Sequence, residues 1–217
     1  MSQTEIKTYQ ITINKKLRQT DDPILLGRQI LNLEGLDVIS NIVFQLGPDH
    51  IMEHLRNDET TDLRVSGVEE FFTFETDRIF RFMLNGVDMQ WGANKINVPT
   101  LLHLSGEDPD EFEIWQEQGS GPDKQISETE FINLGKQGVE IFKTKKATVT
   151  VLYNHQPVEI KKGKYTTEQL NGIFNVPAGY ILELVVEGEF IELKPGRTIK
   201  IKKGMEFLSH APKGSSS

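Results

Sequence analysis

The chain has 217 residues, with 37% hydrophobic and 26% charged side chains, a formal net charge of −8 and no cysteine. This composition is typical of a soluble globular protein rather than a disordered one. The missing cysteines exclude disulfides, thiolate catalysis and cysteine-based zinc sites, and the negative charge argues against nucleic-acid binding, which needs basic patches.

The apolar runs are far shorter than the roughly 20 residues that a membrane span requires. The first residues show no basic and apolar signal pattern, so we expect a cytoplasmic protein without a membrane anchor. Charge is uneven along the chain. Residues 147–217 hold nine Lys and Arg against seven Asp and Glu, whereas residues 1–146 hold fifteen against twenty-five.

The first set of predicted elements begins with an alternating strand at 9–13 that runs into Asn14. Asn tolerates the left-handed conformation of tight hairpin turns, so a second strand is expected after it. Apolar residues at helical spacing follow at 25–33, ending near Gly35, and then a strand at 42–46. After a polar loop, Gly67 precedes a closing strand that includes Phe71.

The same order of elements recurs twice. The second set has strands at 79–83 and 112–115 and a helix at 98–104, with Pro99 in its first turn and its end near Gly106. The third has strands at 148–152, 157–160 and 180–185 and a helix at 167–174, for which Thr166 or Thr167 is a plausible N-cap.

Two kinds of landmark keep one period. The turn residues Asn14, Asn85 and Asn154 lie 71 and 69 residues apart. The closing glycines Gly67, Gly138 and Gly204 lie 71 and 66 residues apart. A period that holds for two independent landmarks indicates an internal repeat.

The order hairpin, helix, strand, strand predicts a β-grasp, in which the first and last strands lie side by side under one helix. The fold class is therefore α+β, with three tandem domains at residues 9–76, 77–145 and 146–208. Residues 1–8 and 209–217 are expected to be tails. A solenoid is the alternative, but each unit here carries a complete set of strands and a helix. The linkers at 75–77 and 144–146 are short, so neighbouring domains are expected to touch.

The sequence resembles the bacterial multi-ubiquitin proteins, which string together ubiquitin-like β-grasp domains. The resemblance is carried by Ile13-Asn14, by Gly27-Arg28-Gln29-Ile30-Leu31 and by Asp62-Leu63 leading to Gly67-Val68-Glu69-Glu70-Phe71. It is closest over residues 9–74. It implies three ubiquitin-like domains, E1-like, E2-like and peptidase partners, target proteins, and a role in conjugation linked to phage defence.

In such a modifier, the C-terminal carboxylate is the reactive group. The chain ends Ser209-His210-Ala211-Pro212-Lys213-Gly214-Ser215-Ser216-Ser217. We expect cleavage between Gly214 and Ser215, beside Lys213, because glycine leaves the reactive carbonyl unobstructed. There is one glycine rather than two, and Pro212 restricts the preceding residue. A disordered tail, a Gly-Ser engineering scar and an uncleaved tail that docks on another copy are the alternatives.

Phe72 is a candidate partner-interface residue, because it points opposite to its neighbours in the closing strand. The alternative is that this face of the strand packs on the next domain. Lys202 and Lys203 are candidates for a basic surface that meets an acidic E1-like or E2-like protein, although lysines also protect strand edges. His50 to His54 spells H-x-x-E-H, but it falls in the loop after the third strand of its repeat and is interpreted as a chance pair.

No nucleophile–base pair, metal cluster or cofactor loop is evident, so we expect a non-enzyme without metal or cofactor. The leading hypothesis is a ubiquitin-like modifier processed and conjugated by dedicated partners in a bacterial antiphage pathway. The first alternative is a protein that assembles into oligomers or filaments through its β-grasp domains. A second alternative is a passive adaptor. A modifier requires Gly214, whereas an assembly protein does not.

Overall fold

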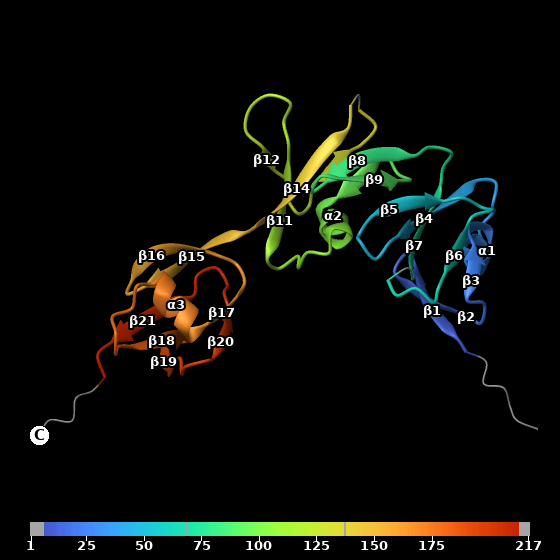
Figure 1. The fold of residues 1–217 in the computed structure, drawn as a ribbon. Coiled ribbons are helices and arrows are strands. Elements are labelled where there is room, and N and C mark those ends of the chain that lie inside the picture. Colours follow the sequence, from blue (N-terminus) through green and yellow to red (C-terminus); the bar gives the residue numbers. More distant parts are fainter. Residues whose placement is uncertain (1–6, 68, 137, 213–217) are drawn as a thin grey trace, which may run out of the picture. The chain divides into compact units, whose positions relative to one another are not determined.

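The computed structural model describes residues 7–67, 69–136 and 138–212. Along the chain it forms three five-stranded sheets, each with one helix (Figure 1). The predicted α+β class and the three sheet–helix units are confirmed.

Each sheet has the same strand order: hairpin partner, first strand, last strand, third strand, edge strand. Domain 1 comprises β1 Tyr9–Ile13, β2 Lys16–Thr20, β4 Asn41–Leu46, β5 Met52–Leu55 and β7 Glu70–Glu75. Domain 2 comprises β8 Phe80–Leu84, β9 Val87–Trp91, β11 Phe112–Gln116, β12 Lys124–Gln125 and β14 Glu140–Lys146. Domain 3 comprises β15 Thr148–Tyr153, β16 Gln156–Lys161, β18 Ile181–Val186, β19 Glu189–Glu192 and β21 Glu206–His210.

The first and last strands of every domain pair in parallel, as the β-grasp prediction requires. Ile13 pairs with Phe71 in domain 1, and Tyr153 pairs with Phe207 in domain 3. The last strand therefore lies at the centre of each sheet and pairs with a strand on either side.

The predicted asparagine turns are tight hairpins in which both central residues have positive φ. Asn14 and Lys15 have φ of 50° and 65°, and Asn154 and His155 have φ of 47° and 64°. This combination defines the type I′ turn, whose twist matches that of the flanking strands.

The helices are α1 Gly27–Leu33, α2 Val98–Ser105 and α3 Thr167–Ile173. Thr166 is the N-cap of α3, and its hydroxyl accepts a hydrogen bond from Gln169 N–H. Pro99 lies in the first turn of α2, and Gly106 ends that helix in the left-handed conformation. The N-cap of α3 and the positions of Pro99 and Gly106 in α2 agree with the sequence prediction.

The sequence analysis missed a short two-stranded ladder in each domain. These ladders pair β3 Ile24–Leu26 with β6 Thr60–Asp62, β10 Lys95–Asn97 with β13 Phe131–Asn133, and β17 Lys164–Thr166 with β20 Thr198–Lys200. Each leads directly into the helix. The first helix consequently begins at Gly27, two residues later than predicted, because Leu25 and Leu26 belong to β3.

Every domain has a core of its own. In domain 1, Ile11, Ile30 and Phe71 pack between sheet and helix. Val151, Leu170 and Phe207 do so in domain 3. Burial of such aliphatic and aromatic side chains is the main source of stability in domains of this size.

The chain divides into two compact units. Unit 1 holds the described residues of Met1–Pro109 and Glu113–Lys145, which contain domains 1 and 2. Unit 2 holds those of Asp110–Phe112 and Lys146–Ser217, which contain domain 3. The tail was expected to start at Ser209, but β21 continues to His210 because Ser209 and His210 still pair with Leu182 and Ile181.

Candidate functional site: the outer sheet faces and the last strand

A side-chain clasp repeated in all three domains joins the hairpin turn to the last strand. The Asn14 side chain donates to Thr73 Oγ1 at 2.8 Å and accepts from Thr73 N–H at 3.0 Å. Asn85 and Thr144 repeat both bonds in domain 2 at 3.0 and 2.9 Å. The asparagine thus has two roles, the left-handed turn and the clasp. Only the first was evident from the sequence.

In domain 3 the clasp anchors the strand that leads to the C-terminus. Asn154 Oδ1 accepts from Ser209 N–H at 2.9 Å. The Tyr153 hydroxyl and the Ser209 hydroxyl lie 2.7 Å apart. These bonds hold β21 up to its last residues, after which Ala211 and Pro212 are exposed.

Each sheet has one face on its helix and an opposite face, the outer face. On the outer face of domain 1, Phe44 pairs across the strands with Phe72, and Phe74 lies two residues further along the same strand. Phe44 and Phe72 are only 0% and 5% exposed. Apolar outer-face residues this deeply buried need a cover.

Domain 2 supplies that cover, within unit 1. The Trp91 ring lies 4.7 Å from the Phe74 ring and 5.5 Å from the Phe72 ring, measured between centroids. Gly92 follows, and a Cβ on it would come within 2.4 Å of the Phe74 ring. The expectation that neighbouring domains touch is confirmed for domains 1 and 2.

This packing corrects the expectation for Phe72. Its ring is enclosed by Trp91 and His103 inside the chain, so an external partner cannot reach it while domains 1 and 2 are packed together. Phe74 shares its face and its cover, although the sequence analysis singled out Phe72 alone.

Polar contacts complete the contact between domains 1 and 2. Met52 N–H donates to Met89 Sδ at 3.3 Å, and His54 N–H donates to Gln90 Oε1 at 3.1 Å. Both donors belong to the edge strand β5, so side chains of β9 satisfy backbone groups that an edge otherwise leaves open. His103 Nε2 lies 2.7 Å from Glu70 Oε1.

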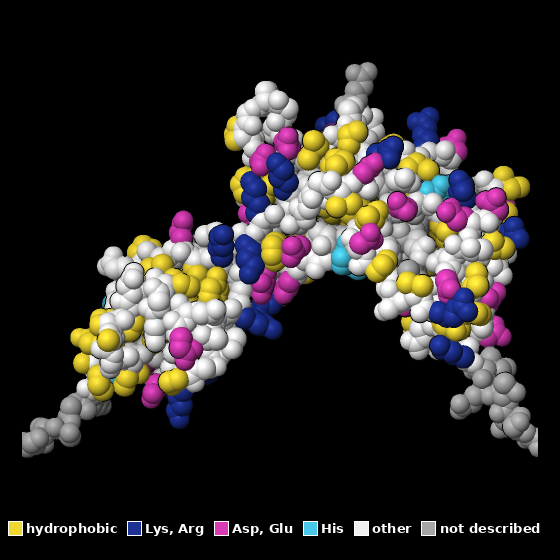
Figure 2. Space-filling model, in the orientation of Figure 1, with side chains coloured by type: hydrophobic (Ala, Val, Ile, Leu, Met, Phe, Trp, Pro, Cys, Tyr) yellow, Lys and Arg dark blue, Asp and Glu magenta, His cyan; other side chains and the backbone are white. Residues whose placement is uncertain are grey.

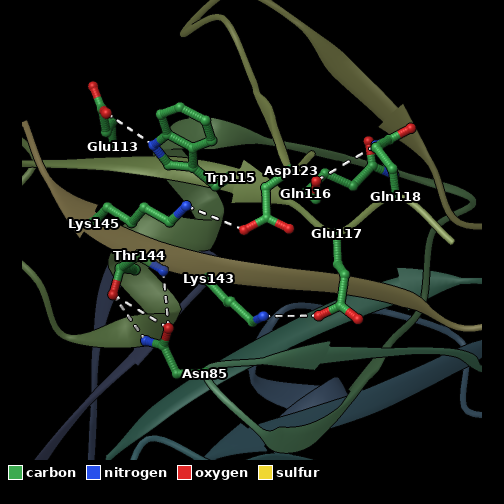
Figure 3. Close-up of polar contacts among 10 residues, drawn as sticks. All are labelled: Asn85, Glu113, Trp115, Gln116, Glu117, Gln118, Asp123, Lys143, Thr144 and Lys145. Atoms are coloured by element: carbon green, nitrogen blue, oxygen red, sulfur yellow. Dashed lines mark hydrogen bonds and ion pairs between the residues drawn. The ribbon is translucent and has the colours of Figure 1, made fainter. Parts of the chain in front are cut away.

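The outer face of domain 2 is ionic instead of apolar (Figure 3). Lys145 Nζ lies 4.1 Å from the centre of the Trp115 ring and 3.1 Å from Asp123 Oδ2. Lys143 pairs with Glu117 at 2.8 Å. Lys143 and Lys145 take the places that Phe72 and Phe74 hold in domain 1, and the ion pairs and the cation–π contact suit a solvated face.

The outer face of domain 3 combines apolar and acidic side chains. Leu208 pairs across the strands with Glu183, and Val185 pairs with Glu206 and with Phe190. Phe190 is 60% exposed. Figure 2 shows hydrophobic side chains gathered on domain 3 near the end of β21.

The sequence of domains 1 and 2 matches a known protein family. A model of the multiubiquitin family matches residues 9–76 and 80–147. The chain belongs to the multiubiquitin family. A search of curated proteins finds no match.

The two matched stretches of the multiubiquitin chain coincide with domains 1 and 2. Domain 3 lies outside the match except for residues 146 and 147, yet it has the same strand order and the same hairpin turn. Its asparagine also bonds to the last strand. The third repeat therefore rests on the structure and on the sequence period rather than on the family model.

The residues expected to carry conjugation, Lys213, Gly214 and Ser215, lie outside the described residues. Lys202 and Lys203 follow β20 and are exposed. They adjoin a cation-rich surface of unit 2 that holds the pKa of Asp110 below its usual range. The cause is chiefly a hydrogen bond from Lys200, with the charges of Lys162 and Lys202 adding to it.

The H-x-x-E-H stretch is not in a loop alone: His50 lies in a turn and His54 on β5. Burial lowers the pKa of His54, whose ring packs on Phe44 at 5.6 Å between centroids. Within the described ranges, no group of three His, Asp or Glu side chains is arranged to hold a metal ion. Over those same residues, no helix has the length and apolar character to cross a bilayer.

Proposed function

We propose that this multiubiquitin chain is a protein modifier that is conjugated through the segment following β21. The observation that carries the proposal is the anchoring of β21. This strand pairs with β15 and β18, is clasped by Asn154 at Ser209, and is followed by exposed Ala211 and Pro212. A segment that leaves a rigid central strand can enter an enzyme channel without unfolding its domain.

The chemistry follows from the carboxylate that cleavage exposes. A peptidase hydrolyses the bond between Gly214 and Ser215. An E1-like enzyme then joins the Gly214 carboxylate to AMP from ATP and releases pyrophosphate. An enzyme cysteine displaces AMP to form a thioester, which passes to an E2-like cysteine. A target nucleophile finally attacks the carbonyl and releases the thiol.

Gly214 suits this sequence of attacks because it has no Cβ beside the reacting carbonyl. Pro212 limits the conformations of the segment and favours an extended approach. Lys202 and Lys203 are proposed to meet an acidic surface of the E1-like or E2-like partner. Resemblance to the multi-ubiquitin proteins of bacterial conjugation pathways supports a role in antiphage defence. That the chain is not itself an enzyme remains a prediction.

Intact mass spectrometry tests the proposal. The chain is incubated with ATP, lysate, a candidate peptidase and a candidate E1-like protein. We expect loss of the three serines after Gly214, followed by heavier adducts that form only with ATP.

Two matched variants locate the reactive residue. Gly214→Val places a branched side chain at the reacting carbonyl and should abolish the adducts. Ser216→Val lies in the released tripeptide and should leave them unchanged. An unchanged mass, or adducts that survive in Gly214→Val, would refute conjugation at Gly214.

A further inference from the structure

The positive charges of domain 3 are concentrated in two short stretches of its sequence. Of the nine Lys and Arg in residues 147–217, eight lie in 161–164 or 194–203, and neither stretch holds an Asp or Glu. The β17–β20 ladder brings the two stretches together and sets Lys164 directly opposite Lys200. Like charges that face each other on paired strands are destabilising, so this arrangement favours an anion beside it.

The chain itself places one carboxylate on this surface at Asp110. Residues 110–112 precede β11 in the sequence but belong to unit 2. Asp110 Oδ2 lies 2.8 Å from Lys200 Nζ. The hydrogen bond from Lys200, aided by the charges of Lys162 and Lys202, lowers the pKa of Asp110. Three lysines from the two cationic stretches therefore act on one carboxylate.

A second carboxylate, that of Glu111, is seated more deeply. Its side chain is 15% exposed, and its Oε2 lies 3.4 Å from Lys146 Nζ. The backbone carbonyl of Glu111 accepts from Ala147 N–H at 2.9 Å. A Cβ on Gly163 would stand only 3.6 Å from this carboxylate, so the glycine backbone borders its seat. Glu111 is thus held through both its main chain and its side chain, which is how proteins recognise peptide segments.

The cationic surface, as the term is used below, holds more positive charge than these two carboxylates neutralise. Lys164, Lys202 and Lys203 are exposed on it. In all it sets six lysines against two carboxylates, the six being Lys146, Lys162, Lys164, Lys200, Lys202 and Lys203. Such a surplus selects partners of negative charge.

The cationic surface is remote from the end of the last strand. Lys162 follows the open end of the β15–β16 hairpin, where Thr148 pairs with Lys161. The last strand β21 runs parallel to β15 and ends at the other end of that hairpin, where Ser209 bonds to Asn154. In Figure 1, β17 and β20 lie on the side of domain 3 away from the end of β21. A partner on the cationic surface therefore leaves that end of the domain accessible.

We propose that the cationic surface is a docking site for an acidic segment of a partner protein, and that Asp110 and Glu111 occupy part of it until such a segment displaces them. For Lys202 and Lys203 this rests on the proposed function, to which it adds the chemistry that the partner presents: several Asp and Glu within one short peptide. Because the partner has to replace two ion pairs and a backbone hydrogen bond, the site admits a strongly acidic segment and rejects a weakly charged one.

Fluorescence anisotropy of a labelled peptide tests the proposal. The probe carries two consecutive copies of the sequence of residues 107–112, Glu-Asp-Pro-Asp-Glu-Phe, and so repeats the segment that the surface already holds. It is titrated with the full chain at low salt, without ATP or any enzyme. We expect binding that weakens as added salt screens the charges. A control peptide with every Asp and Glu replaced by its amide should bind at least about tenfold more weakly.

A charge reversal on the cationic surface should remove the binding. Lys162→Glu with Lys202→Glu changes two lysines that act on Asp110 and should weaken binding of the acidic probe at least about tenfold. Lys16→Glu with Lys95→Glu is the matched control. It makes the same change of charge at two exposed lysines of unit 1 and should leave binding close to that of the wild type.

Removing the resident carboxylates should have the opposite effect. Asp110→Asn with Glu111→Gln frees the site from its internal competitor, so the probe should bind about tenfold more tightly. Glu189→Gln with Glu192→Gln removes as much negative charge from exposed positions of β19. This control should tighten binding far less, which separates competition for the site from a general change in charge.

Four results would overturn the proposal. They are a probe that does not bind the wild type at low salt, equal binding by Lys162→Glu with Lys202→Glu, and binding by Asp110→Asn with Glu111→Gln that is no tighter than that of its control. The fourth is a single-stranded DNA of eight nucleotides that binds as tightly as the acidic probe, which would make the surface a general polyanion site.

Two further measurements keep the test specific. If circular dichroism shows that Lys162→Glu with Lys202→Glu unfolds domain 3, Lys162→Gln with Lys202→Gln replaces it and should weaken binding in the same direction. Gly214→Val should bind the probe like the wild type, because the assay involves no conjugation. Failure of probe binding would therefore refute the docking site alone, and failure of adduct formation would refute conjugation alone.

Discussion

Removing the Trp91 ring tests whether domains 1 and 2 fold as one body. Trp91 is 7% exposed, and its ring contacts Phe72 and Phe74 across the contact between the domains. Trp91→Ala deletes two aromatic pairs worth about 0.5–1.5 kcal/mol each. Together with the lost burial and the cavity left behind, the free energy of unfolding should fall by about 3–5 kcal/mol.

The effect should cross from one domain to the other. Although the substitution lies in β9 of domain 2, the backbone of β7 in domain 1 loses its cover and should exchange its amide hydrogens faster. Hydrogen exchange followed by mass spectrometry on peptides spanning Glu70–Glu75, with urea unfolding of the whole chain, measures both quantities.

The second tryptophan provides a matched control. Trp115 lies on the ionic outer face of domain 2, where its ring contacts Lys145. Trp115→Ala should cost about 1 kcal/mol or less, since an exposed cation–π contact contributes little. It should leave exchange in β7 unchanged. Unaltered β7 exchange in Trp91→Ala, or equal exchange in both variants, would refute the shared core.

Three further predictions concern single residues. Asn14→Ala loses the clasp to Thr73 and places alanine at a φ of 50°, so thermal unfolding should show that the protein is less stable by roughly 2 kcal/mol. Asn14→Gly loses only the clasp and should be destabilised less. Equal destabilisation in both variants would contradict the expected backbone strain. Gly92→Ala should lower the free energy of unfolding by about 1–3 kcal/mol, measured with urea, because its Cβ would overlap the Phe74 ring. A variant as stable as the wild type would contradict this and show that the ring can move away. Burial lowers the folded-state pKa of His54 below 6.5, so the unfolded state binds more protons than the folded state. Unit 1 should therefore lose stability as the pH falls below about 6.5. The midpoint of urea unfolding, measured across pH, tests this, and the pH-dependent loss should be smaller in His54→Gln.

Much of the fold was predictable because its signals are local. The Asn14 and Asn85 turns, the Thr166 cap, and the positions of Pro99 and Gly106 depend on the backbone preferences of single residues and their neighbours. The short ladders that lead into the helices were missed, because strands of three residues carry too little alternation to be recognised.

The candidate surfaces were harder to predict. Alternation along β7 showed that Phe71 and Phe72 point to opposite faces, but not that Trp91 would cover Phe72. Phe190 and Leu208 are distant in the sequence and share one face only through the register of their strands.

The sequence by itself determined the number of domains, the order of their elements and the turns that join their hairpins, since these follow from local propensity and from a period that holds along the chain. Only the tertiary structure decided what each outer face does. The alternation of side chains along a strand shows which residues share a face, whereas the residues that cover that face belong to another domain. That cover makes the outer face of domain 1 part of a core. In domain 3, the register of the strands brings Phe190, Val185 and Leu208 together on an outer face that holds the exposed Phe190.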